Sequence, residues 1–128
     1  ALIKRHNIMA NILIVDDSAS MRQMIKFTLE VENHKITEAR DGKEGLKHAS
    51  EHKYDLVITD VNMPEMNGIE LTAQIRELAN YKSIPVLLLT TESAGDKKKE
   101  GKNAGATGWL IKPFDPTKLV QVVTKVLR

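Results

Sequence analysis

The sequence predicts a single α/β domain with five parallel strands in a doubly wound sheet and five helices on its two faces. Short apolar segments rich in Val, Ile and Leu alternate along the chain with longer amphipathic segments. This alternation is typical of a parallel sheet covered on both faces. The chain has 128 residues, of which 41% are hydrophobic and 28% charged. Those values fit one globular domain and exclude intrinsic disorder as the starting assumption.

Each strand is predicted from a short run of apolar or β-branched residues. The strands are expected at residues 12–15, 35–39, 56–59, 86–89 and 107–111. The second run is the weakest, and the turn pair Asp41-Gly42 closes it. Pro85 opens the fourth run. The first and third runs are continuously apolar or β-branched, as expected for strands buried on both faces.

The first three helices are predicted from apolar residues that recur at helical spacing. Ser18 or Ser20 can cap the first helix. Its inward stripe is Met21, Met24, Ile25, Thr28 and Leu29. The second helix is expected near residues 43–52. The third follows a loop at residues 62–68 and turns Leu71, Ile75 and Leu78 inward.

The last two helices differ in how strongly the sequence predicts them. A helix at residues 96–104 is weakened by Gly95 and Gly101. The final helix starts at Pro116, which suits a first-turn position. It buries Leu119, Val122, Val123 and Val126.

Charge and composition exclude several classes of protein. The net charge is +2, but Lys4 and Arg5 account for that excess and the rest of the chain is balanced, so the net charge says little about partners. We expect no nucleic-acid partner. Met9 resembles a natural start, and residues 1–8 are expected to be a leader or added extension before a domain at residues 9–128. No apolar run approaches the roughly 18 residues of a membrane span. The chain has no cysteine, which excludes thiolate chemistry and suits the cytoplasm.

Polar side chains follow four of the predicted strands. Asp16 and Asp17 follow the first, Asp60 the third, Thr90-Thr91 the fourth, and Lys112-Pro113 the fifth. In an open parallel sheet, ligands bind outside the carboxyl ends of the strands. We therefore expect three carboxylates, a hydroxyl and an ammonium group to meet at one edge.

Each of these residues also has a plain structural explanation. Asp16 and Asp17 suit the positive end of a helix, and a lysine at a strand end is usually solvated. Together, however, three adjacent carboxylates would have raised pKa values unless a cation neutralised them. Oxygen ligands of this kind suit Mg²⁺. Lys112 and Thr90 could then bind phosphoryl oxygens beside an aspartate nucleophile. The residues alone thus predict a magnesium-dependent phosphoryl site.

The motifs also resemble a known family. The segments at residues 14–17, 59–68, 89–90 and 105–114 are similar to the motif set of bacterial response-regulator receiver domains, the CheY-type chemotaxis regulators above all. The resemblance covers residues 11–128. It implies the flavodoxin-like (βα)5 fold with strand order 2-1-3-4-5, for which CheY is itself a standard example.

This resemblance implies roles for individual residues. Asp60 would accept the phosphoryl group from a histidine kinase. Asp17, Asp60 and the Asn62 backbone carbonyl would ligate Mg²⁺, for which Mn²⁺ can substitute, while Asp16 would act through a bound water. Lys112 would pair with the phosphoryl group.

The resemblance also implies a switch. Thr90 would reorient toward the phosphate, with Thr91 beside it, and Asn62 and Glu92 would flank the water that removes it. The Lys112-Pro113 peptide bond would be cis.

Two residues depart from the family pattern. Trp109 stands where tyrosine or phenylalanine is usual, and Thr91 stands where a smaller residue is common. Trp109 either shifts inward on phosphorylation or keeps one solvent-facing rotamer.

Three classes of function fit the sequence. The first is a monomeric signalling receiver, not a turnover enzyme, that binds a partner protein. A CheA-like histidine kinase, a flagellar motor switch protein and a phosphatase would be its partners. The second is the receiver portion of a transcription factor or a phosphorelay intermediate. The third is an aspartyl-phosphate phosphohydrolase, which is disfavoured because Asp60-Val61-Asn62 lacks a second acid and follows the third strand.

The remaining polar residues have simpler interpretations. His34, His48 and His52 lack convergent metal spacing and are expected at the surface. Lys97, Lys98, Lys99 and Lys102 form either a solvated helix face or a surface for an acidic peptide.

Overall fold

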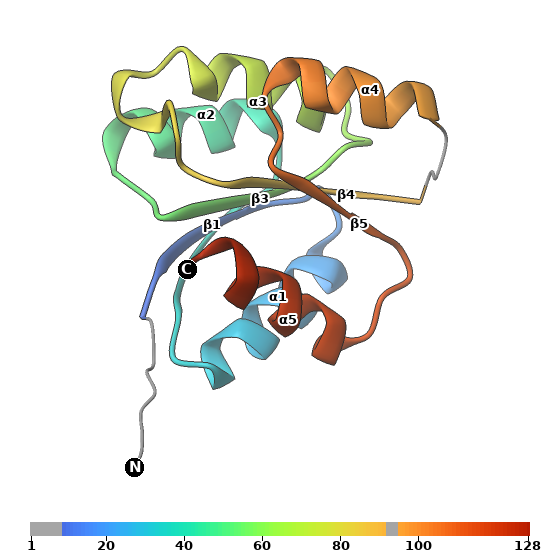
Figure 1. The fold of residues 1–128 in the computed structure, drawn as a ribbon. Helices are drawn as coiled ribbons and strands as arrows, with labels where there is room; N and C mark the ends of the chain where they lie inside the picture. Colours follow the sequence, from blue (N-terminus) through green and yellow to red (C-terminus); the bar gives the residue numbers. More distant parts are fainter. Residues whose placement is uncertain (1–8, 92–94) are drawn as a thin grey trace.

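The computed structural model describes residues 9–91 and 95–128. The expected leader at residues 1–8 and the expected role of Glu92 therefore lie outside the described residues. Five strands form one parallel sheet in the order β2-β1-β3-β4-β5 (Figure 1). The strands are β1 (Asn11–Val15), β2 (Lys35–Ala39), β3 (Leu56–Asp60), β4 (Val86–Thr90) and β5 (Gly108–Ile111). The predicted fold and strand order are confirmed.

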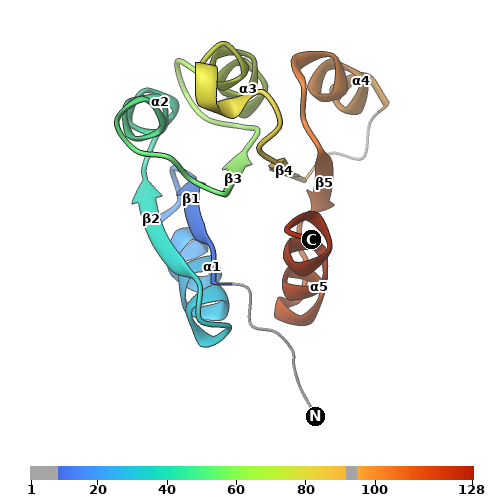
Figure 2. The ribbon, with the colours of Figure 1, turned by 60° about the vertical axis from the view of Figure 1, so that its left-hand side comes forward.

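The helices cover both faces of this sheet. They are α1 (Ala19–Val31), α2 (Gly42–Glu51), α3 (Gly68–Arg76), α4 (Gly95–Ala104) and α5 (Pro116–Val126). Helices α1 and α5 lie on one face, and α2, α3 and α4 lie on the other (Figure 2). Each face has its own core, one centred on Ile12, Ile14 and Leu29 and the other on Leu13, Val15 and Leu71. In the described part of the chain, no helix is long and apolar enough to cross a membrane.

Short polar side chains begin four of the helices. Ser18, Asp41 and Asp115 cap α1, α2 and α5 by accepting a hydrogen bond from a backbone N–H three residues later. Asn67 forms a reciprocal capping box with Glu70 at the start of α3. These caps satisfy N–H groups that have no partner within the helix. They also fix where the loops at the carboxyl edge of the sheet end.

The third helix is shorter than predicted. It ends at Arg76, and Leu78 precedes a 3-10 helix, η1 (Ala79–Tyr81), that the sequence analysis did not anticipate. The amides of Glu77 and Leu78 bond to carbonyls three residues back, so the chain tightens at this point. Leu78 still packs against the core on the α2–α3 face, but from outside the helix.

Candidate functional site

Three aspartates meet at the carboxyl ends of β1 and β3, and we call them the acid pocket: Asp16, Asp17 and Asp60. Each offers a carboxylate oxygen, and these oxygens lie within 4.8 Å of one another. Asp16 is fully buried and Asp60 is 5% exposed, whereas Asp17 is exposed to solvent. Strands β1 and β3 are hydrogen-bonded neighbours, which explains why residues 44 positions apart share one site. The pocket opens to solvent on the side of Asp17.

A single lysine compensates the two buried carboxylates. The Nζ of Lys112 lies 3.1 Å from Asp60 Oδ1 and 3.5 Å from Asp16 Oδ2. Lys112 follows β5, and its backbone N–H donates to the Thr90 carbonyl at 2.8 Å. Its peptide bond to Pro113 is cis. The lysine therefore reaches the acid pocket from the far side of β4.

The acid pocket carries more negative charge than Lys112 offsets. The pKa of Asp60 is raised above its ordinary value, first because burial disfavours the charged form and then because Asp16 and Asp17 repel it. The hydrogen bond from Lys112 opposes this rise. Asp16 Oδ2 is buried and accepts no hydrogen bond from the residues that the structure describes. An oxygen-preferring divalent cation, or water bound to it, fits this donor set.

The β3–α3 loop turns back onto the end of β3 at a glycine. Gly68 donates its N–H to the Val61 carbonyl at 3.0 Å, and a Cβ atom at this position would overlap the carbonyl oxygen of Asp60. Only glycine permits this approach. Asn62 is exposed at the start of the same loop, two residues after Asp60. Gly68 lies within one of the sequence motifs, but motif spacing does not show how closely two backbone segments approach, so this contact could not be predicted from it.

Comparison with known proteins now identifies the family. The model of the response regulator receiver domain matches residues 12–124. The chain belongs to this family. Chemotaxis protein CheY4 of Vibrio cholerae is 47% identical, with a TM-score of 0.91, and the match covers 94% of this chain and 100% of that one. A response regulator of Chloroflexus aurantiacus is 32% identical, with a TM-score of 0.88 over 94% of this chain and 98% of that one.

Longer relatives match as well. The transcriptional regulatory protein ResD of Bacillus subtilis is 38% identical over 117 residues, which are 91% of this chain and 48% of ResD. The chain therefore spans about half the length of the curated relatives it matches. Membership of the receiver family makes this chain a receiver domain of two-component signalling.

The two threonines after β4 differ in their surroundings. Thr90 ends β4, is fully buried, and pairs in register with Ile111 of β5. Its neighbour Thr91 is exposed. The register of β3 with β4 places Asp60 opposite Leu89, one residue before Thr90. The register thus places Thr90 beside the acid pocket.

Trp109 lies against α4 in this structure. The indole is half-buried and packs against a small cluster of Val61, Ile69 and Leu88. A Cβ atom on Gly101 of α4 would lie 2.6 Å from Trp109 Cζ2. The missing side chain of Gly101 makes room for the ring beneath α4, and an inward shift of Trp109 on phosphorylation stays a prediction.

The histidines that the structure describes take no part in the acid pocket. The metal-binding geometry found among the described residues consists of the three aspartates alone. His52 is exposed as predicted, but His34 and His48 are half-buried. His34 Nδ1 accepts a hydrogen bond from the backbone N–H of Ala10 at 3.2 Å. The prediction of a surface position for His34 was wrong, because the chain between α1 and β2 packs against the start of β1.

Proposed function

We propose that this receiver accepts a phosphoryl group on the carboxylate of Asp60 in a magnesium-dependent reaction. The observation that carries the proposal is the acid pocket, where two further carboxylates and Lys112 converge around Asp60. Asp17, Asp60 and the Asn62 backbone carbonyl would hold Mg²⁺, and Asp16 would act through a bound water. The cation would offset negative charge on the phosphoryl oxygens. Mn²⁺ can substitute, because it takes similar oxygen ligands.

The residues of this chain would each take one part in the transfer. A carboxylate oxygen of Asp60 forms a bond to phosphorus while the bond from phosphorus to the donor breaks, and the leaving group keeps that electron pair. With acetyl phosphate, the leaving group is acetate. Lys112 would leave its contact with Asp60 and pair with a phosphoryl oxygen. Thr90 would then turn its hydroxyl toward the phosphate, and Thr91 would border it.

The proposed output is protein binding and not turnover of a substrate. The phosphoryl group stays on the chain until water removes it, and Asn62 and Glu92 would influence how long it persists. Because each chain would hold one phosphoryl group, we propose that this protein is a phosphoacceptor that assists its own phosphorylation and dephosphorylation. It would act as a monomer in the cytoplasm, and a phosphatase would be an additional partner.

Mass spectrometry of the intact protein tests this proposal. The protein is incubated with acetyl phosphate, with Mg²⁺ or with EDTA, and its mass is measured. We expect a mass gain of one phosphoryl group that requires the metal and is absent in Asp60→Asn. The control is Asp115→Asn, which makes the same substitution at a helix cap outside the pocket, where asparagine also caps well. Labelling that persists in Asp60→Asn, or that needs no metal, would refute the proposal.

We further propose that the signalling pathway is chemotaxis. Two features support this: CheY4 of Vibrio cholerae is a chemotaxis protein of similar sequence, and this chain matches its whole length. The kinase would then be CheA-like and the target a flagellar motor switch protein. The competing proposal is the receiver portion of a transcription factor, which the match to ResD and SrrA supports.

A binding measurement separates these two pathways. The protein is activated with beryllofluoride and Mg²⁺, and its affinity is measured for a motor switch protein from the same organism. Tighter binding on activation supports chemotaxis. If activation leaves this affinity unchanged, and the native gene encodes a DNA-binding domain after Arg128, the transcription-factor proposal replaces the chemotaxis proposal.

A further inference from the structure

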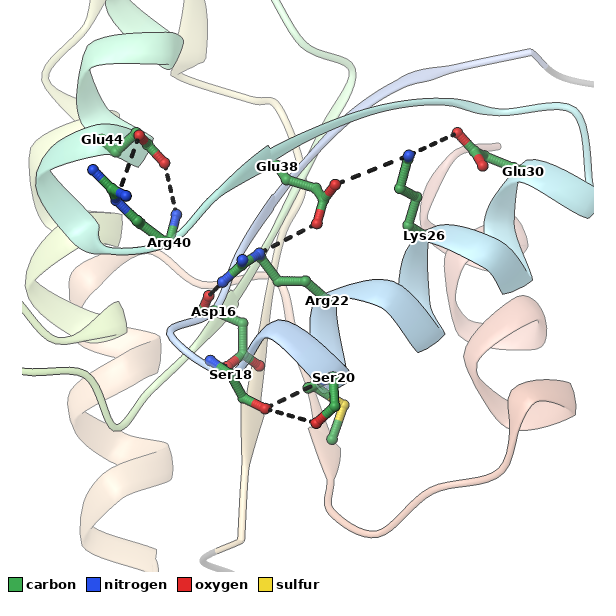
Figure 3. Close-up of polar contacts among 10 residues, drawn as sticks. Asp16, Ser18, Ser20, Arg22, Lys26, Glu30, Glu38, Arg40 and Glu44 are labelled. Atoms are coloured by element: carbon green, nitrogen blue, oxygen red, sulfur yellow. Dashed lines mark hydrogen bonds and ion pairs between the residues drawn. The ribbon is translucent and has the colours of Figure 1, made fainter.

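Arg22 of α1 contacts the backbone of Asp16, one of the three residues of the acid pocket (Figure 3). Its Nη1 donates a hydrogen bond of 2.6 Å to the backbone carbonyl of Asp16, and its Nε lies 3.2 Å from Glu38 Oε1 on β2. The guanidinium group therefore joins the β1–α1 loop to the neighbouring edge strand. The Arg22 side chain is only 17% exposed.

Glu38 fixes the direction in which the guanidinium group points. The planar, forked donor set of arginine can contact the carboxylate and the carbonyl at once. Lys26 lies 4.0 Å from the other oxygen of Glu38 and 3.9 Å from Glu30, as Figure 3 shows. Glu38 is thus held by two residues one turn apart on the same face of α1, and Arg22 meets a carboxylate whose position is already constrained.

The hydrogen bond from Arg22 is the third of the hydrogen bonds that position Asp16. The backbone N–H of Asp16 donates to the Ala39 carbonyl at 3.1 Å, and Asp16 Oδ1 accepts from the Ser18 N–H at 2.8 Å. The carbonyl of Asp16 belongs to the same peptide unit as the N–H of Asp17. Fixing this carbonyl therefore fixes the direction in which both carboxylates leave the backbone.

We propose that Arg22 is a positioning residue for the acid pocket. Its guanidinium group holds the Asp16 carbonyl, so that the carboxylates of Asp16 and Asp17 keep the spacing that a divalent cation needs despite their mutual repulsion. Glu38 acts through Arg22 by orienting the guanidinium group. This inference rests on the proposed function, because it takes the acid pocket to be a cation site. It adds two residues that touch neither the cation nor the phosphoryl group.

Mg²⁺ affinity measured by titration calorimetry tests the role of Arg22. Arg22→Met keeps most of the apolar stem but removes every donor, and groups behind metal ligands typically contribute about 10- to 100-fold to metal affinity. We expect a loss in that range for Arg22→Met. Arg22→Lys should restore part of the affinity. The control, Arg40→Met, removes an arginine that pairs with Glu44 at 4.0 Å and is 76% exposed. The Mg²⁺ affinity of Arg40→Met should equal that of the wild type.

A second variant tests the role of Glu38 and guards against misfolding. Glu38→Gln should weaken Mg²⁺ binding less than Arg22→Met does, and the double variant should be no weaker than Arg22→Met alone, because both residues act through one contact. Urea unfolding in EDTA gives the folded fraction of each variant at the temperature of the titration. Unchanged affinity in folded Arg22→Met, or additive losses in the double variant, would overturn the inference.

The wild type, measured in parallel, separates the two proposals. If it binds Mg²⁺ but gains no phosphoryl mass from acetyl phosphate, the proposed function fails and the role of Arg22 in cation binding stands. If it gains the phosphoryl mass and Arg22→Met binds Mg²⁺ as tightly as the wild type, only the inference fails. A wild type that binds no Mg²⁺ overturns both.

Discussion

Lys112 is the residue on which the charge balance of the metal-free acid pocket depends. Its ammonium group contacts Asp60 and Asp16, both of which are buried. Removing one partner of a buried ion pair leaves the other charges uncompensated. The same lysine competes with a cation for the same oxygens, so stability and metal affinity should respond to it in opposite directions.

We therefore predict that Lys112→Met lowers the free energy of unfolding in EDTA at pH 7 by about 1–3 kcal/mol. Its Mg²⁺ affinity should equal or exceed that of the wild type, and saturating Mg²⁺ should restore much of the lost stability. Binding of a partner should no longer respond to phosphorylation. Urea unfolding with and without Mg²⁺ checks the first two effects, with Lys118→Met on the exposed side of α5 as the control. Weaker Mg²⁺ binding in Lys112→Met would contradict this account of the charge balance.

Asp60 gives the acid pocket a defined pH dependence. Its pKa is raised in the folded protein, chiefly by burial, so between the ordinary carboxyl pKa and the raised value the folded state binds more protons than the unfolded chain. Its contribution to stability is therefore greatest at low pH and is lost as the pH rises through the raised pKa.

The matched variant for this effect is Asp60→Asn, which keeps the shape and cannot ionise. In EDTA, we predict that its stability advantage over the wild type is smallest near pH 4 and grows as the pH rises toward 7. Urea unfolding at a series of pH values measures that difference. With saturating Mg²⁺ the wild type should regain stability, whereas Asp60→Asn should gain less. A difference that stays flat from pH 4 to 7 would show that the raised pKa of Asp60 does not act on stability.

At the scale of elements, α4 is held at one end and supported in the middle by Trp109. Arg76 of α3 donates two hydrogen bonds, of 3.0 and 2.8 Å, to the carbonyl of Gly105 just after α4. Gly101 rests on the indole ring of Trp109 and on Leu88. Any shift of the indole toward Thr90 must therefore change how the middle of α4 is supported.

Gly101→Ala tests this packing. Alanine favours a helix by about 1 kcal/mol over glycine, yet its methyl group would lie 2.6 Å from the indole and 2.7 Å from Leu88 Cδ1. Overpacking of this kind costs about 1–3 kcal/mol. We predict a net loss of stability and an altered Trp109 emission without any phosphate. Asn103→Ala, at an exposed position of the same helix, should change neither emission nor packing. Normal emission in Gly101→Ala would contradict the contact.

Trp109 can also report on activation, because it is the only tryptophan in the chain. We predict that beryllofluoride with Mg²⁺ changes its emission or its quenching by acrylamide. Thr90→Ala should diminish the change, because the buried hydroxyl would couple the phosphoryl mimic to β5. An unchanged signal together with normal activation-dependent partner binding would show that the protein switches without moving Trp109.

At the scale of the whole molecule, the alternation of apolar runs and helical stripes was enough to predict the parallel sheet. The acid pocket could be predicted from the residues that follow each strand, because parallel strands bring their carboxyl ends to one edge of the sheet whatever their separation in the sequence. Such sequence patterns could not predict individual contacts between residues of different elements. Three contacts depend on how two elements pack, which neither periodicity nor spacing encodes. They are the approach of Gly68 to Asp60, the packing of Trp109 beneath Gly101 and the hydrogen bond from Arg22 to Asp16.

The central claim is that Asp60, and no other carboxylate of the acid pocket, receives the phosphoryl group. Borohydride reduces an acyl phosphate to an alcohol, so treatment after incubation with acetyl phosphate and Mg²⁺ marks the acceptor as homoserine. Peptide mass spectrometry then locates the mark. The account predicts homoserine at position 60 alone, in an amount that depends on Mg²⁺. Homoserine at Asp16 or Asp17, or at position 60 equally in EDTA, would contradict it.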